Sequence, residues 1–183
     1  MPVSDSKRSR FESIVTPHLD AAYNLARWLT GKDHDAQDVV QEAMLRAFMY
    51  FDGFRGVAAR AWVLKIVRNT CFTWLQANRP SESIAVEDLQ DVMPALFCSV
   101  SVDDPETIAL RHTEAVQLND AIAAIPPGFR EVIVLREMEG LSYKEIATVI
   151  DLPIGTVMSR LARARAELRR VLKSPQCVKG DNK

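Results

Sequence analysis

The stretch GLSYKEIATVIDLPIGTVMSR, residues 140–160, decides the fold of the C-terminal part of this chain. Ser142 and Glu145 have the spacing of a capping box, in which each side chain binds the backbone N–H of the other residue, so a helix is predicted to begin there. A break at 151–153 ends this helix, and a second run of apolar residues at helical spacing continues to about Leu172. A helix, a tight turn and a second helix make a helix-turn-helix pattern.

The second helix of this pattern is basic. Its cations would neutralise phosphates, while Thr156, Met158 and Ser159 near its N-terminus would face base edges in a major groove. The competing interpretation is a solvated basic face on an ordinary helix, but the order of capping box, turn and basic helix favours DNA binding. The cations are Arg160, Arg163, Arg165, Arg169, Arg170 and Lys173.

Helical apolar spacing predicts five further helices, and no segment shows strand-like alternation. We therefore expect an all-α fold. The five helices are predicted over 11–29 with Gly31 as the C-terminal cap, from Asp35 as N-cap to about Phe51, over 58–78, from about Leu118 to a stop at Pro126 and Pro127, and over 129–139.

Charge divides the chain, although the net charge is only −1. Residues 80–110 carry 7 acidic and 0 basic side chains and contain three prolines, which is typical of a linker. Scattered apolar residues there equally allow a short amphipathic helix that docks on a partner. The sequence thus predicts two small helical domains, 1–79 and 111–173, joined by a flexible acidic linker over 80–110 and followed by a tail over 174–183. Domains this small have thin cores and usually depend on a partner.

Several classes of protein are disfavoured. The chain has no run of about 18 apolar residues and no hydrophobic stretch behind its polar N-terminus, so we expect a cytoplasmic protein without membrane insertion. Three scattered histidines and the absence of known catalytic motifs argue against an enzyme. Asp38 and Glu42 are one helical turn apart, but no third ligand accompanies them, so neither a metal nor a cofactor is predicted. Cys71, Cys98 and Cys177 are interpreted as ordinary thiols, with a redox role for Cys98 or Cys177 left open.

Cations and aromatic residues alternate before and within the predicted helix over 58–78. Such a mixture suits single-stranded nucleic acid, because bases stack on rings while phosphates need countercharge. Trp62 and Trp74 lie in the apolar stripe and are expected mainly in the core. The remaining residues of this group are Phe54, Arg55, Gly56, Arg60, Lys65, Arg68 and Asn69.

Several motifs in one order resemble bacterial RNA polymerase sigma factors of the extracytoplasmic-function (ECF) group. The resemblance extends from about Phe11 to Leu172. The motifs are DVVQEA at 38–43, FRG at 54–56, Ala61-Trp62 with Asn69-Thr70, FRE at 129–131, GLSYKEIA at 140–147 and GTVMSR at 155–160.

The resemblance implies a two-domain initiation factor that binds core RNA polymerase and promoter DNA. It places Asp38, Gln41 and Glu42 against the clamp helices of the largest polymerase subunit, and it implies a further contact with the flap of the β subunit. The minus-ten element would be read and opened by Phe54, Arg55, Gly56, Arg60, Arg68 and Asn69. The minus-thirty-five duplex would be read by Thr156, Met158, Ser159, Arg160, Arg163 and Arg165.

Other expectations follow from the same resemblance. The free protein is expected to be a monomer that directs transcription of a stress or envelope-response regulon under the control of an anti-sigma factor. Met158 departs from the Arg or Lys that many relatives carry, and Ala162 replaces an aromatic residue of some. Two other hypotheses are a conventional regulator that dimerises on duplex operator DNA and an adaptor without promoter function.

Overall fold

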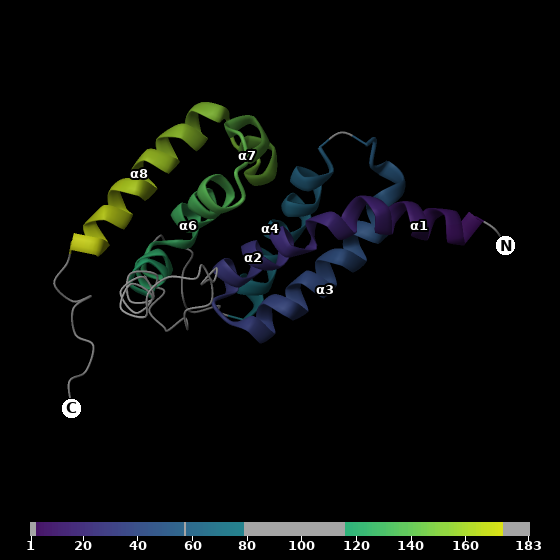
Figure 1. Ribbon diagram of the computed structural model, residues 1–183, viewed down its shortest axis with the longest axis horizontal. Helices are drawn as coiled ribbons and strands as arrows, with labels where there is room; N and C mark the ends of the chain where they lie inside the picture. The colour runs from purple at the N-terminus through teal and green to yellow at the C-terminus, as the bar shows by residue number, and fades with distance from the viewer. Residues whose placement is uncertain (1–2, 57, 79–115, 174–183) are drawn as a thin grey trace, which may run out of the picture.

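The computed structural model describes residues 3–56, 58–78 and 116–173 (Figure 1). These residues form helices and turns, without a strand among them, which confirms the all-α prediction. The predicted linker over 80–110, the predicted tail, Cys98 and Cys177 lie outside the described residues. The domain boundaries stay predictions.

The N-terminal helices come first along the chain. They are α1 (Val3–Val15), the 3₁₀ turn η1 (Thr16–His18), α2 (Leu19–Thr30), α3 (Asp33–Tyr50), the 3₁₀ turn η2 (Phe51–Gly53) and α4 (Ala59–Asn78). The helix predicted over 58–78 is confirmed as α4.

The single helix predicted over 11–29 is wrong, because η1 divides it into α1 and α2. Pro17 lies in η1, and a proline removes the N–H that an α-helical ladder needs. Asp35 is not the N-cap of the next helix either, since α3 begins at Asp33 and Asp35 lies in its first turn. The predicted cap at Gly31 is confirmed: its φ is 81°, a left-handed conformation, and its N–H donates to the Arg27 carbonyl at 2.9 Å.

The C-terminal helices follow after residue 115. Residues 116–124 are helical, and then come α6 (Pro127–Ile133), the π-helical turn η3 (Val134–Met138), α7 (Tyr143–Ile150) and α8 (Ile154–Lys173). The helix expected over 129–139 therefore begins earlier, at Pro127, because the first turn of a helix tolerates a proline. The predicted helix-turn-helix is confirmed as α7 and α8.

The capping box at the start of α7 has the predicted form. The Glu145 N–H donates to Ser142 Oγ at 3.3 Å, and the Ser142 N–H donates to Glu145 Oε2 at 2.8 Å. The Ser142 hydroxyl also donates to Glu145 Oε2 at 2.7 Å, and this bond, followed by the one from the Ser142 N–H, lowers the pKa of the Glu145 carboxyl. Asp151, in a left-handed conformation with φ 59°, ends α7.

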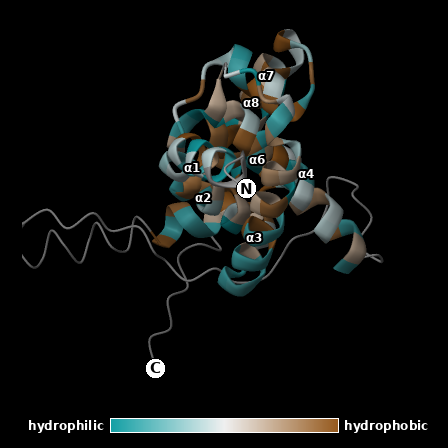
Figure 2. Cartoon of the chain, turned by 90° about the vertical axis from the view of Figure 1, so that its right-hand side faces the viewer, coloured by the Kyte–Doolittle hydropathy of each residue, from teal (hydrophilic) through white to brown (hydrophobic). Residues whose placement is uncertain are grey.

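The two groups of helices share one hydrophobic core. Buried apolar residues of α2, α3 and α4 belong to the same cluster as those of α6, α7 and α8. Between the two groups, α4 contacts α7 and α2 contacts α6. Figure 2 shows hydrophobic and hydrophilic positions alternating along the helices, as amphipathic packing requires. Within the part of the chain that the structure describes, no helix has the length and apolarity to cross a membrane.

Candidate nucleic-acid interface

The helix α8 is fixed by one apolar edge and presents its other faces outward. Val157, Leu161 and Ala164 are buried against the core. Met158 is 52% exposed, and Ser159 and Arg163 are also exposed, so these side chains are available to a partner. The Ser159 hydroxyl donates to the Thr156 carbonyl at 3.0 Å, which ties it to the first turn of α8, and Thr156 itself is half-buried.

Two predicted minus-thirty-five cations have carboxylate partners. Arg165 Nη2 donates to Glu137 Oε1 at 2.5 Å, and both side chains of this pair are partly exposed. Arg160 is half-buried, and its Nη1 donates to Glu131 Oε1 at 3.1 Å. Exposed pairs of this kind are weak and exchange readily with phosphate, whereas a pair with a buried carboxylate is harder to separate.

The predicted minus-ten residues lie on α4 and in the turn before it. Arg55 and Gly56 are exposed in the turn, where Gly56 has a φ of 78°. Asn69 is exposed on α4, and its Oδ1 accepts from Arg68 Nη1 at 3.3 Å. The Arg68 guanidinium also lies over the Phe72 ring, 4.3 Å from its centroid, in a cation–π contact.

Phe54 belongs to the core rather than to this exposed group. Its side chain is buried, and its ring lies 4.8 Å from that of Trp62 and 6.1 Å from that of Phe51, centroid to centroid. Phe54 therefore anchors the turn that carries Arg55. Trp62 and Trp74 are both half-buried and pack against the core, as their place in the apolar stripe predicts.

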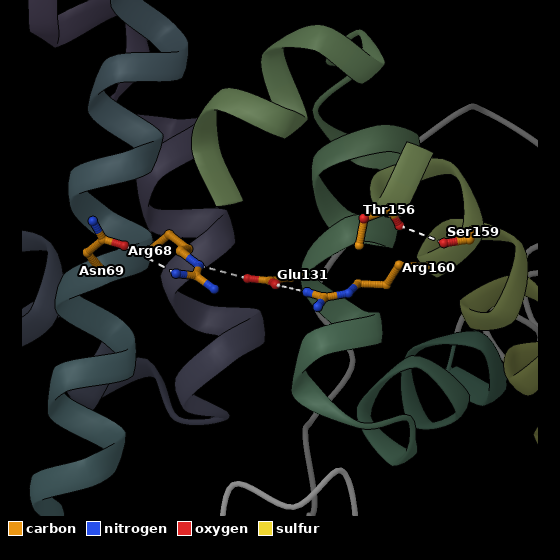
Figure 3. A network of polar contacts seen from close by, with 6 residues as sticks. All are labelled: Arg68, Asn69, Glu131, Thr156, Ser159 and Arg160. Atoms are coloured by element: carbon orange, nitrogen blue, oxygen red, sulfur yellow. Dashed lines mark hydrogen bonds and ion pairs between the residues drawn. The ribbon is translucent and has the colours of Figure 1, made fainter. Parts of the chain in front are cut away.

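Sequence reasoning assigned no role to Glu131, which joins a residue of the predicted minus-ten group to one of the predicted minus-thirty-five group (Figure 3). Its side chain is 1% exposed on α6, and its Oε2 accepts from Arg68 Nε at 3.0 Å while its Oε1 accepts from Arg160. Burial raises the pKa of the Glu131 carboxyl, and the two arginines oppose this rise. The sequence carried two signals for Glu131: its place in the FRE motif at 129–131, and a carboxylate next to the apolar run 132–135, since an acid is rarely buried without a partner.

Two other residues that sequence reasoning left without a role lie nearby. Glu139, largely buried, accepts from Asn24 Nδ2 at 2.6 Å and from Arg60 Nη2 at 2.5 Å. Arg130, also buried, donates to four backbone carbonyls, one of which is the carbonyl of Trp28 in α2 at 2.8 Å. Both residues thus connect the C-terminal helices to the N-terminal ones.

Comparison with known proteins shows that each half of the chain matches a family model. Residues 14–80 match the family model "Sigma-70 region 2", and residues 115–168 match "Sigma-70, region 4". The chain is 38% identical to the ECF RNA polymerase sigma-E factor of Haemophilus influenzae, over 89% of this chain and 87% of that protein. This chain belongs to the ECF family of RNA polymerase sigma factors.

Other relatives agree with this assignment. The sigma factor is 35% identical to the RNA polymerase sigma-H factor of Pseudomonas aeruginosa, over 93% of this chain and 90% of that one. This chain is also 33% identical to the ECF sigma factor SigE of Mycolicibacterium smegmatis. The match covers 87% of this chain but only 60% of SigE. Because sigma factors regulate transcription and are not enzymes, the expectation that this chain is no enzyme is confirmed.

Two solved structures share the fold. The sigma factor RpoE of Bartonella quintana, in complex with the anti-sigma factor NepR, has a TM-score of 0.68 and 26% identity, covering 91% of this chain and 98% of that one. CnrH in complex with the cytosolic domain of CnrY has a TM-score of 0.63 and 25% identity, covering 92% and 90%.

The predicted polymerase-binding face of the sigma factor lies on α3. Asp38, Gln41 and Glu42 are exposed there, while Val39 and Ala43 are buried on the opposite side. Within α3, Glu42 Oε1 accepts from Arg46 Nε at 2.8 Å. The three predicted residues therefore form one exposed, polar and mainly acidic surface.

The sigma factor shows no metal-binding cluster among its described residues: no group of three or more His, Cys, Asp or Glu side chains is suitably placed. Cys71 is fully buried in α4, and burial raises the pKa of its thiol to about 12. The thiol is therefore neutral at physiological pH and is a poor nucleophile.

Proposed function

We propose that this sigma factor binds core RNA polymerase through Asp38, Gln41 and Glu42 and directs it to specific promoters. The observation that carries this proposal is the exposed acidic surface on α3, in a chain whose family membership is shown by both of its halves. Acidic side chains on a rigid helix suit a basic or polar partner surface, because they steer association and set its register. We propose the clamp helices of the largest polymerase subunit as that surface, with the flap of the β subunit as a second contact.

In the polymerase complex, the two DNA-binding groups would act on different parts of the promoter. Arg55, Gly56 and Asn69 are exposed and suit contact with the opened minus-ten strand, with Arg60 and Arg68 as phosphate-binding cations. Phe54 would support this group from beneath. Opening a base pair costs a few kcal/mol, so the polymerase must contribute to this step.

The minus-thirty-five element would be read by the N-terminal half of α8. Ser159 and Arg163 are exposed, and Met158 offers an apolar contact in place of a cation. Thr156, Arg160 and Arg165 complete this group. An apolar side chain is suited to a thymine methyl group, whereas an arginine prefers guanine, so we expect Met158 to change the preferred base at its position.

Regulation and location follow the same proposal. Because RpoE and CnrH were solved with the anti-sigma factor NepR and with CnrY, we propose that an anti-sigma factor controls this chain and its stress or envelope-response regulon. We place the protein in the cytoplasm, where RNA polymerase and promoter DNA are found, and expect it to be a monomer when free.

The decisive experiment measures binding to purified bacterial core RNA polymerase by pull-down. Asp38→Lys with Glu42→Lys should weaken binding at least about tenfold, because like charges then face the partner surface. The matched control reverses two exposed acids elsewhere, Glu12→Lys with Asp20→Lys, and should bind as the parent does.

Two results would contradict the proposal. Equal polymerase binding by both double variants would remove α3 as the contact. No polymerase binding by the parent, together with tight binding of a dimer to duplex DNA, would favour a conventional regulator.

A further inference from the structure

The first helix, α1, places an exposed cation beside the turn that carries Arg55. The guanidinium of Arg10 lies over the Phe51 ring, 5.4 Å from its centroid. Phe51 is buried, and its ring stacks at 6.1 Å on that of Phe54, the residue directly before Arg55. Figure 1 shows α1 and this turn in the half of the molecule away from α8. Arg10 and Arg55 therefore lie next to one aromatic cluster.

Contacts on both sides of Arg10 hold α1 in this position. Lys7 Nζ donates to Asp52 Oδ2 at 2.6 Å, which joins α1 to the 3₁₀ turn η2. The Phe11 ring meets the Phe51 ring edge-on, with 5.3 Å between the centroids. Because Lys7 precedes Arg10 and Phe11 follows it, the helix that carries Arg10 is fixed beside η2 without any ion pair made by Arg10 itself.

Arg10 and Arg55 differ from neighbouring cations in their lack of an acidic partner. Arg60 and Arg68, two cations of the predicted minus-ten group, are each bound by a buried carboxylate. Among the described side chains, neither Arg10 nor Arg55 takes part in an ion pair. An unpaired guanidinium keeps its N–H groups for a phosphate, since carboxylates and phosphates compete for the same donors.

We propose that Arg10 is a further contact for single-stranded DNA, which binds a backbone phosphate of the opened minus-ten strand close to the one bound by Arg55. This inference rests on the proposed function, in which the turn at 54–56 contacts that strand. Sites for single strands combine contacts to bases, here those proposed for Asn69, with cations placed along the backbone. Arg10 extends the cations from α4 and the turn onto α1.

The test measures how the binding of a fluorescein-labelled oligodeoxythymidine to the full chain depends on salt, by fluorescence anisotropy. Each phosphate contact with a single strand contributes about 0.7 to the slope of log K against log salt concentration. Arg10→Gln should therefore make the slope shallower by about 0.7 and weaken binding about fivefold at ~0.1 M salt. Arg10→Lys keeps the charge and should keep the slope of the parent.

A purely structural role for Arg10, as a cover for the Phe51 ring, predicts a different result. Loss of the cation–π contact in Arg10→Gln would lower the melting temperature, measured by circular dichroism. It would leave the salt slope unchanged, because the slope reports the number of phosphates neutralised and not the stability of the fold. The slope therefore separates the two roles.

The matched control is Arg8→Gln, which removes the same charge from the same helix. Arg8 is also exposed, but its Nε donates to Glu12 Oε1 at 2.8 Å, so its guanidinium already has an acidic partner. Arg8→Gln should keep the salt slope of the parent.

The inference would be overturned if the parent did not bind the oligonucleotide, if Arg10→Gln kept the parent slope, or if Arg8→Gln changed the slope as much as Arg10→Gln. Arg55→Gln and the polymerase pull-down separate this result from the proposed function. A shallower slope for Arg55→Gln but not for Arg10→Gln would contradict the inference alone. Failure of the parent to bind polymerase would contradict the function, while the slopes still report whether Arg10 binds a single strand.

Discussion

The N-terminal helices and the C-terminal helices contribute different side chains to the contact between them. The C-terminal helices supply two buried carboxylates, Glu131 and Glu139, and the N-terminal helices supply their partners Arg68, Arg60 and Asn24. Apolar packing surrounds these pairs in a core common to both groups. The difference teaches that cations predicted to bind DNA, Arg60 and Arg68, are structural partners of the C-terminal helices in this arrangement.

The shared core stabilises both groups of helices, which were predicted to be two small domains. Each alone has a thin core, and the sequence predicted dependence on a partner. In the structure, each group of helices is the partner of the other: α4 contacts α7, and α2 contacts α6. A shared core should make the two regions unfold as one unit.

The largest effect is expected from removal of a core side chain. Leu25 in α2 and Leu135 in η3 are both fully buried, and Leu25→Ala or Leu135→Ala should lower the free energy of unfolding by about 2–5 kcal/mol. If the core is shared, scanning calorimetry should show one transition that either substitution lowers. Two transitions, of which each substitution moves only one, would show that the regions unfold independently.

An intermediate effect is expected at Arg130, whose guanidinium binds carbonyls from both regions. Arg130→Ala should lower the free energy of unfolding by about 3 kcal/mol, because it removes the donor to several buried carbonyl groups, among them that of Trp28. Urea denaturation measures this loss. The exposed Arg169 is the control, and Arg169→Ala should change stability by less than about 0.5 kcal/mol. Equal costs at the two positions would contradict a bridging role for Arg130.

The smallest effect is expected at the capping box, which lies within the C-terminal region. Ser142→Ala should lower the free energy of unfolding by about 1 kcal/mol at neutral pH, because it removes the N-cap of α7. The pKa of Glu145 is lowered by its bonds with Ser142, so this contribution is present above the ordinary glutamate pKa and is lost as pH falls through the lowered one. Urea denaturation at a series of acidic pH values should show that the difference in the free energy of unfolding between Ser142→Ala and the parent becomes smaller as pH falls. A constant difference at every pH would exclude a role for the Glu145 charge.

Local features of the fold could be predicted from the sequence because neighbouring residues determine them. The capping box of Ser142 and Glu145 and the left-handed cap at Gly31 follow from side-chain type and spacing. Pro17 shows the limit of this reasoning: apolar spacing continues through it, and a prediction from spacing missed the break that its ring imposes.

The candidate site was predicted less completely. Exposed residues such as Asn69, Arg163 and Asp38 lie where a partner can reach them, as the motifs indicate. The burial of Phe54 was not expected, because an aromatic residue beside arginines is equally compatible with a binding surface and with a core. The burial of the Phe54 side chain and its contacts with the rings of Phe51 and Trp62 distinguish the two.

Most of the helices, the helix-turn-helix and the motifs of the sigma-factor family could be read from the sequence, because periodicity, caps and motifs are properties of neighbouring residues. The contacts of Glu131 with Arg68 and Arg160 could be found only in the folded molecule. Which cations a carboxylate binds depends on their distance in space and not on their separation in the sequence. Glu131 becomes buried, and therefore needs these partners, only when α4, α6 and α8 pack together.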